Sequence, residues 1–266
     1  MRSATFLFVL AVSSAAFAAE LTETFSRTLD VRPGTSFEIE NVNGSITISG
    51  WDQPRVRIHA VKRVKSRDSA AAQQAMKALR VEVRQSSGSV VVDTIYPKRS
   101  DLGMFDRLFG SDSVNAGVKY EINVPRAMNL SVDTVNGTIR VTEVSGEIDL
   151  DTTNGKIEVA NCSGSVDAST TNGAIAVELV SVAPGRNMKF ETTNGRITLA
   201  VPAGLAADIN ASTTNGSVQS DLPLTLGRMS RTSIRGTLNG GGPEIKLRTT
   251  NGGIDIRASG AVASRS

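Results

Sequence analysis

The sequence predicts an all-β fold in which strand repeats stack as a β-solenoid, with one short helix near the N-terminus. The first observation is an internal repeat, since self-similarity of this kind is the sequence signature of a repeat architecture. The tetrapeptide Thr-Thr-Asn-Gly occurs five times in the 266 residues, and two related segments bring the copies to seven. The identical copies end at Gly155, Gly173, Gly195, Gly216 and Gly252, and the related ones at Gly44 and Gly137.

The second observation is the spacing of the central repeats. Glycines follow one another at nine-residue steps from Gly137 to Gly173, and the residue before them alternates between Asn and Ser. The true repeat is therefore eighteen residues long and has two unequal halves. After each glycine, aliphatic and polar residues alternate, as in Ile139, Arg140 and Val141. This period of two indicates strands with one buried face.

Two geometries fit a nine-residue step. In an antiparallel meander or sandwich, each Asn-Gly or Ser-Gly would be a two-residue hairpin turn. In a solenoid, each half-repeat would form one side of a flattened coil, and neighbouring coils would be parallel. The recurrence of identical residues favours the solenoid, because stacked coils place like polar side chains over one another, where they can hydrogen-bond.

The solenoid predicts a structural turn ladder along one edge. We expect its glycines to have positive φ, which disfavours any residue with a β-carbon. Gly252 is expected to tolerate substitution better than Gly155, because it belongs to the last copy in the sequence. The ladder consists of Asn136, Gly137, Asn154, Gly155, Asn172, Gly173, Asn194, Gly195, Asn215, Gly216, Asn251 and Gly252.

The segment before Leu130 has a different pattern. Strands are expected within 24–48, which holds the first repeat copy, and over 56–64, 81–83 and 90–95. The stretch RDSAAAQQAMKALR, from Arg67, predicts the single helix, with Ser66 or Asp68 as its cap. We expect this helix to cover an open end of the solenoid, where unpaired strand edges would otherwise aggregate. Its apolar stripe consists of Ala72, Ala75, Met76 and Leu79.

The N-terminus is typical of a secretory signal peptide. One Arg is followed by an apolar run from Phe6 to Val12 and by the small-residue site Ala16-Phe17-Ala18. The sequence thus divides into a signal peptide (1–18), a β-rich capping part with the helix and a long loop (19–129), the β-repeat solenoid (130–258) and a tail (259–266). The mature protein is expected in the periplasm or outside the cell, with no transmembrane segment.

The composition does not point to nucleic acid as a partner. Lys and Arg number 29 against 26 Asp and Glu, so the basic charges are nearly balanced. Cys162 is the single cysteine, so the fold has no internal disulfide, and we expect this side chain to be a small apolar residue rather than a reactive thiol.

The loop from Lys98 to Gly117 differs from the rest, because it gathers large apolar side chains in a chain with few aromatics. It is interpreted either as a latch packed on the core or as an exposed contact site for a partner. The candidate partner-binding residues are Met104, Phe105, Leu108 and Phe109.

The sequence shows no catalytic constellation. His59 is the only histidine and lies on an expected strand, and there is no Cys/His metal spacing or phosphate-binding glycine loop. We therefore expect no catalytic residues, no metal and no cofactor. Asp149 and Asp167 would lie one coil apart on one face, which leaves surface carboxylates as the basis of an enzymatic alternative.

Several features together resemble a bacterial family known as putative adhesins, a domain of unknown function built of β-strand repeats. They are the TTNGxIxV repeats, the SGxIxL half-turns between them, the export signal, the small helix and the ending GGGPEIKLRTTNGGIDI. The resemblance covers roughly residues 37–256 and implies a β-solenoid-like protein of the cell envelope, with no catalytic residues to carry over.

The function predicted from the sequence is that of an exported, non-enzymatic, adhesin-like β-repeat protein. It would bind or scaffold another envelope component, either a protein or a polysaccharide. The alternative is a carbohydrate-active enzyme using surface carboxylates, and a third possibility is a purely structural scaffold. The mature chain has only Trp51, Tyr96 and Tyr120 as Trp or Tyr residues, all outside the central repeats, so it offers few aromatic platforms for a sugar. The identity of the partner and the oligomeric state stay open at this point.

Overall fold

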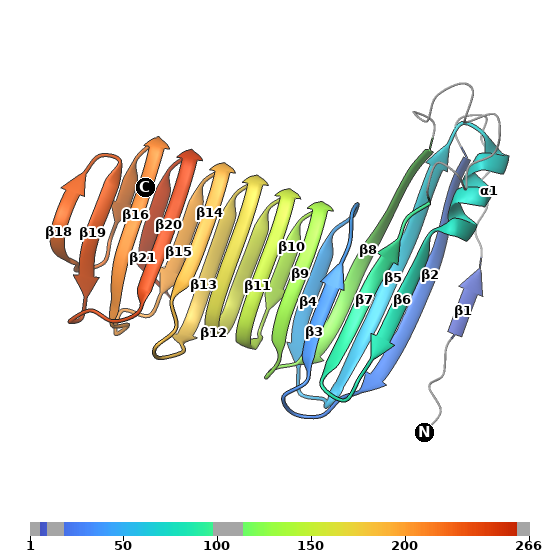
Figure 1. The fold of residues 1–266 in the computed structure, drawn as a ribbon, viewed down its shortest axis with the longest axis horizontal. Helices are drawn as coiled ribbons and strands as arrows, with labels where there is room; N and C mark the ends of the chain where they lie inside the picture. The colour runs from blue at the N-terminus through green and yellow to red at the C-terminus, as the bar shows by residue number, and fades with distance from the viewer. Residues whose placement is uncertain (1–5, 10–18, 98–113, 260–266) are drawn as a thin grey trace, which may run out of the picture.

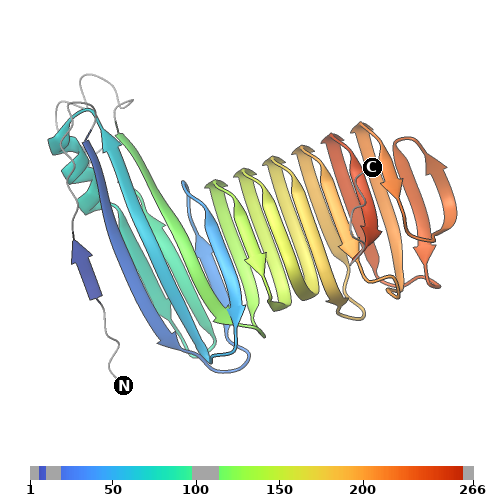
Figure 2. The ribbon, with the colours of Figure 1, turned by 180° about the vertical axis from the view of Figure 1, so that it is seen from behind.

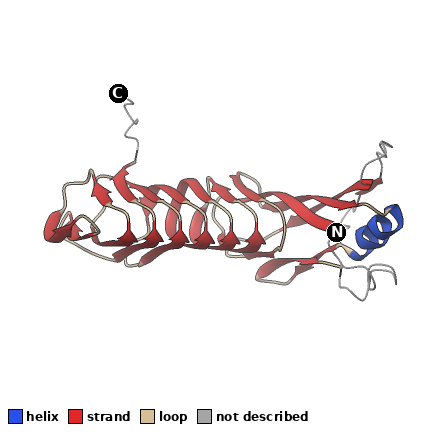
Figure 3. Cartoon of the chain, turned by 90° about the horizontal axis from the view of Figure 1, so that it is seen from above, coloured by secondary structure: helices blue, strands red, loops and turns tan. Residues whose placement is uncertain are grey.

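The protein is a flattened β-solenoid whose strands form two facing sheets (Figure 1, Figure 3). The computed structural model describes residues 6–9, 19–97 and 114–259. Strand β12 (Ile157–Asn172) turns the corner from one sheet to the other and so joins them. The predicted solenoid is confirmed, and the antiparallel meander is not formed, because Ser145 pairs with Ser163 and Ile139 with Ile157 in parallel register.

The first sheet contains the strands that lead into the Asn-Gly turns. Neighbours along the stack come from distant parts of the sequence, and the ends of the sheet are closed by antiparallel pairs. In spatial order its strands are β6 (Arg80–Gln85), β7 (Ser89–Ile95), β3 (Ser36–Glu40), β9 (Asn129–Asn136), β11 (Ser145–Asn154), the second half of β12, β14 (Met188–Asn194), β20 (Glu244–Asn251), β16 (Ala207–Asn215), β19 (Ser233–Leu238) and β18 (Thr225–Ser230).

The second sheet contains the strands that leave those turns, and at its N-terminal end three long antiparallel strands extend it (Figure 2). Its strands are β1 (Phe6–Val9), β2 (Ala19–Asp30), β5 (Arg55–Ser66), β8 (Val114–Pro125), β4 (Ile46–Trp51), β10 (Ile139–Thr142), the first half of β12, β13 (Ile175–Val182), β15 (Ile197–Val201), β21 (Ile254–Ala258) and β17 (Val218–Ser220).

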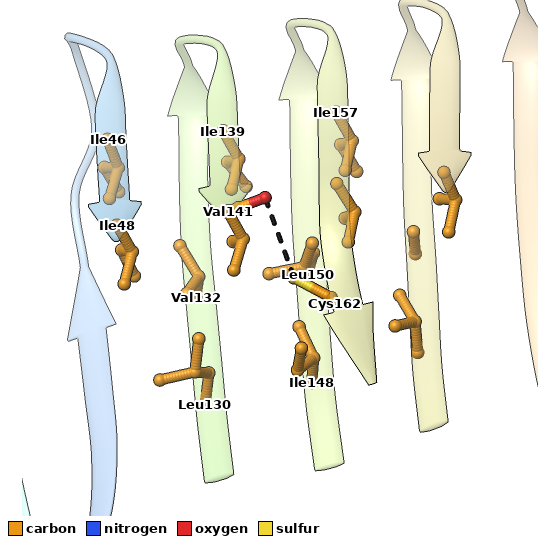
Figure 4. Packing of buried hydrophobic residues seen from close by; sticks show 14 of the residues in the cluster. Ile46, Ile48, Leu130, Val132, Ile139, Val141, Ile148, Leu150, Ile157 and Cys162 are labelled. Carbon is orange, nitrogen blue, oxygen red and sulfur yellow. Dashed lines mark hydrogen bonds between the residues drawn. The ribbon is translucent and has the colours of Figure 1, made fainter. Parts of the chain in front are cut away.

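The core lies between the two sheets and consists of aliphatic rows. Because side chains alternate along a strand, every second residue points inward, and parallel in-register stacking puts like residues side by side. One such row is visible in part in Figure 4. It is fully or almost fully buried and comprises Ile46, Ile139, Ile157, Ile175, Ile197, Ile254 and Val218.

The predicted helix is present as α1 (Ser69–Ala78) and packs on β2, β5 and β8 at the N-terminal end of the stack (Figure 1). Asp68 caps it by accepting a hydrogen bond from the backbone N–H of Ala70 at 2.8 Å. The apolar stripe expected from the sequence is buried. Lys62 fixes the other end of the helix, because its ammonium donates to the Leu79 carbonyl at 3.2 Å and pairs with Glu23 at 3.0 Å.

Candidate functional site

The Asn-Gly edge of the solenoid carries a continuous amide ladder. Each Asn side chain donates from Nδ2 to the Oδ1 of the Asn in the neighbouring coil, at 2.7–2.9 Å. Such a ladder rewards identical residues, because only a side chain with both a donor and an acceptor can continue it. In donor-to-acceptor order the ladder runs from Asn215 through Asn251, Asn194, Asn172, Asn154 and Asn136 to Asn43.

A second row of hydrogen bonds lies directly behind this ladder. The buried first threonine of each Thr-Thr-Asn-Gly copy donates from Oγ1 to the glycine carbonyl of an adjacent coil, as Thr170 does to Gly155 at 3.1 Å. The copy that ends at Gly137 lacks this bond, because Thr134 Oγ1 has no hydrogen-bond partner. The Gly44 carbonyl of the adjacent coil accepts from Asn41 Nδ2 instead, at 3.2 Å. The two rows make this edge rigid, and the Asn amides and Thr hydroxyls that form them are hydrogen-bonded within the protein.

The glycines of the ladder are required for a different reason than the one expected. Of the seven Asn-Gly glycines, all of which the structure describes, only Gly44 and Gly252 have positive φ, at 128° and 157°. The expectation of positive φ is therefore wrong for most of them. A β-carbon on Gly173 would instead lie 1.8 Å from the carbonyl oxygen of Gly155. Close contact between backbones of adjacent coils, rather than a left-handed conformation, excludes a side chain there.

The coils do not stack in sequence order. The C-terminal coil, formed by β20 and β21, lies between the β14–β15 coil and the β16–β17 coil (Figure 1). Gly252 therefore has a coil on each side, and a β-carbon there would lie 2.0 Å from the Gly195 carbonyl oxygen. The expectation that Gly252 occupies an end of the stack is wrong.

The surface carboxylates do not form an acid–base pair in a cleft. Asp149 and Asp167 are exposed and lie opposite each other on adjacent strands, where Asp167 accepts from the Lys189 backbone N–H at 2.6 Å. Partial burial, and then repulsion from Asp167, raise the pKa of the Asp149 carboxyl above its ordinary value. Neither carboxylate lines the hollows bounded by Val180, by Arg140 or by Asp208.

His59 and Cys162 are not placed for catalysis either. His59 contacts the Ser26 hydroxyl through Nδ1 at 2.9 Å on the outer face of β5. Cys162 is completely buried, and burial raises the pKa of its thiol, which is the opposite of what a nucleophile requires. Within residues 6–9, 19–97 and 114–259, no three His, Cys, Asp or Glu side chains are placed to hold a metal ion.

The candidate contact residues Met104, Phe105, Leu108 and Phe109 lie outside the described residues. No helix in the described segments has the length and apolarity needed to cross a membrane.

The edge opposite the Asn ladder holds an apolar hollow that the sequence did not predict. In the central coils this edge is a tight corner, where Glu143 and Asn161 take left-handed conformations and Val144 and Cys162 fill the interior. Towards the C-terminal end three longer connections replace the corner. They are 183–187 between β13 and β14, 202–206 between β15 and β16, and 239–243 between β19 and β20.

These three connections surround a hollow of about 460 Å³, which we call the loop-edge pocket. They meet because the C-terminal coil lies between the two coils that carry the other connections. The size is within the range of roughly 300–1,000 Å³ that is usual for ligand sites. Val180 lies at the pocket with 53% of its surface exposed, so it adds accessible apolar surface to the lining.

The walls of the loop-edge pocket are held by side-chain amides. Asn239 Nδ2 donates to the carbonyls of Ala203 and Leu205, both at 2.8 Å, and so ties two of the connections together. Asn187 Oδ1 accepts from the Glu244 backbone N–H at 2.9 Å, which ties in the remaining one. The pocket is therefore preorganised rather than formed by independent loops.

The two facing sheets and the parallel stacking of their coils make the protein a β-solenoid. The chain matches the model of the Toastrack DUF4097 family over residues 24–257, so it belongs to that family. The resemblance seen in the sequence, to a domain family of unknown function built of β-strand repeats, agrees with this membership.

Several solved structures are similar in outline. A putative cell adhesion protein from Clostridium sporogenes ATCC 15579 is 12% identical, with 88% of this chain and 99% of that chain covered and a TM-score of 0.42. A putative adhesin from Bacteroides fragilis NCTC 9343 is 11% identical, with 88% and 96% covered and a TM-score of 0.41. A putative lipid binding protein from Parabacteroides distasonis ATCC 8503 is 13% identical, with 88% and 96% covered and a TM-score of 0.28. No curated protein matches the chain. At these scores the likenesses assign no function.

Proposed function

We propose that the mature protein is an exported, non-enzymatic binding protein that holds another component of the cell envelope, with the loop-edge pocket as its contact site. The observation that carries the proposal is the pocket itself, an apolar hollow with walls pinned by Asn187 and Asn239. A concave, largely apolar and preformed site is the usual form of a ligand site.

A binding role, rather than catalysis, is supported by the chemistry around the pocket. Arg186 is the only side chain with a formal charge among those lining it, so the pocket holds no general acid or base. Asp149 and Asp167, the basis of the carbohydrate-active alternative, are exposed and are not among the residues that line it.

Export is proposed from the sequence, because the apolar run of residues 6–12 precedes the small-residue site Ala16-Phe17-Ala18. Cleavage after Ala18 would remove β1 and leave strand β2 (Ala19–Asp30) intact. Fractionation of cells followed by sequencing of the mature N-terminus tests this point. A chain that stays in the cytoplasm with Met1 intact would contradict it.

The test of the proposed function is capture from an envelope extract by immobilised mature protein. The wild-type chain should retain a specific component. The Val180→Asp variant should retain less of it, because the substitution places a negative charge in the apolar lining of the pocket. Met229→Asp is the matched control, since Met229 is also a large exposed apolar residue, 64% exposed, but lies on β18. If the wild-type protein retains nothing that the control resin does not, the proposed function is wrong.

The segment with Phe105 and Phe109 is a second proposed contact, which rests on the sequence alone. Aromatic anchors dominate interfaces, so Phe105→Ala should weaken capture while changing the melting temperature little. If the segment is instead a latch on the core, the same truncation should destabilise the protein by about 3–5 kcal/mol.

A further inference from the structure

The lining of the loop-edge pocket restricts the chemistry of what it can hold. Its side chains are aliphatic or small, with Val182, Met188, Leu205 and Ile245 among them, and no aromatic residue takes part. A sugar ring would find neither a stacking platform nor a set of converging polar side chains. A flexible aliphatic chain matches this lining, because its only requirement is removal from water.

Arg186 is the one charged side chain among the residues that line the pocket, and the Asp208 carboxylate lies beside the lining residue Gly241. Arg186, in the 183–187 connection, has 59% of its side chain exposed and forms an ion pair with Glu147 of β11. An exposed pair of this kind contributes little to stability, so exchanging its carboxylate for another anion costs little. The guanidinium presents a planar set of donors that suits a carboxylate or phosphate.

We propose that the loop-edge pocket binds a single-chain anionic amphiphile, with the aliphatic chain in the hollow and the anionic head on Arg186. The proposal rests on the proposed function and names the ligand class for the same site. Charge complementarity at Arg186 decides between an anionic amphiphile and a neutral or cationic one. Val180, which stands exposed at the pocket, would be covered by the bound chain.

Glu147 is the residue that an anionic head would displace. Its carboxylate competes with the ligand for Arg186, so removing it should strengthen the binding of an anion without changing the apolar lining. Conversely, Arg186→Gln should weaken the binding of an anionic amphiphile and leave that of a neutral one of equal chain length unchanged. The two variants therefore move affinity in opposite directions for one physical reason.

The experiment uses the mature chain and the fluorescent probe N-phenyl-1-naphthylamine, displaced by dodecanoate or by dodecanol. Wild-type protein should bind the probe and release it to dodecanoate at lower concentration than to dodecanol. Val180→Asp should weaken probe binding about tenfold or more, which is the range expected for a charge placed in an apolar contact, and Met229→Asp should not. Arg186→Gln should remove the preference for dodecanoate, and Glu147→Gln should increase it.

Three results would overturn the proposal. They are no probe binding to the folded wild-type protein, equal binding by Val180→Asp and wild type, or a dodecanoate preference that survives in Arg186→Gln. Capture of an envelope component that is insensitive to Val180→Asp would leave the binding function standing and refute this site. Absence of any capture, with dodecanoate still bound in the pocket, would instead refute the envelope partner and keep the ligand site.

Discussion

Replacing Gly173 by alanine isolates the close contact between adjacent coils. The added β-carbon would lie 1.8 Å from the Gly155 carbonyl oxygen and 2.5 Å from its carbonyl carbon, so the two backbones must move apart by more than 1 Å. Gly173 does not have positive φ, so backbone strain does not contribute. The substitution therefore tests the stacking of coils and no other property of glycine.

The cost follows from the hydrogen bonds that hold the two coils together at this turn. They are Gly155 N–H to the Asn172 carbonyl at 3.1 Å, Thr170 Oγ1 to the Gly155 carbonyl at 3.1 Å, and Asn172 Nδ2 to Asn154 Oδ1 at 2.8 Å. At about 1 kcal/mol each, their loss amounts to about 3 kcal/mol. For a chain of this size the melting temperature should fall by about 6–12 °C.

Gly88→Ala is the matched control, because Gly88 also has no positive φ and a β-carbon there meets no atom within 4 Å. Its melting temperature should stay within about 2 °C of wild type, as for a surface substitution. Calorimetry of both variants, with circular dichroism to confirm the fold, makes the comparison. Equal melting temperatures for Gly173→Ala and Gly88→Ala would refute the argument that backbone contact excludes side chains from the ladder.

Three further predictions concern stacking order, charge and catalysis. Gly252→Val and Gly155→Val should destabilise to a similar degree in urea unfolding, since a β-carbon would lie 2.0 and 1.8 Å from the neighbouring carbonyl oxygens; a mild effect at Gly252 alone would contradict the interleaved coil. Burial, and then repulsion from Asp149, raise the pKa of Asp151, so the folded state retains the proton more strongly than the unfolded state. Stability is therefore lost as pH rises past the ordinary Asp pKa of about 4, and Asp151→Asn should raise the melting temperature at pH 7 but not below about pH 4. Asp149→Asn combined with Asp167→Asn should leave envelope capture intact, and loss of a hydrolytic activity in the folded double variant would support the carbohydrate-active alternative.

The repeat fold could be predicted because its information is local. The alternation around Ile139 and Val141 defines an inward face, and the identical Asn residues at eighteen-residue spacing indicate that coils stack in parallel. The helix was equally predictable, since Asp68 is a good cap and the apolar stripe has helical spacing.

The order of the coils could not be predicted, and the pocket depends on that order. Thr-Thr-Asn-Gly is the same at Gly195, Gly216 and Gly252, so each copy offers its neighbours the same ladder groups and sequence alone does not decide which copies are adjacent. The connections 183–187 and 202–206 contain Pro and Gly, which indicates turns at the surface. Their meeting in one hollow follows only from the position of the C-terminal coil.

The interleaved coil also has a consequence for how the chain reaches its native state. In the folded protein the turn at Asn251 lies between the turns at Asn194 and Asn215. A polypeptide synthesised only as far as residue 243 contains the two outer turns but not yet the one that lies between them. Both turns belong to identical tetrapeptides, so they can associate with each other in a regular but incorrect register. Residues 244–258 are therefore the spacer that makes the correct order unique, and the fold is specified only when the last coil has emerged. A protein of this design gains from staying unfolded until its last coil has been synthesised.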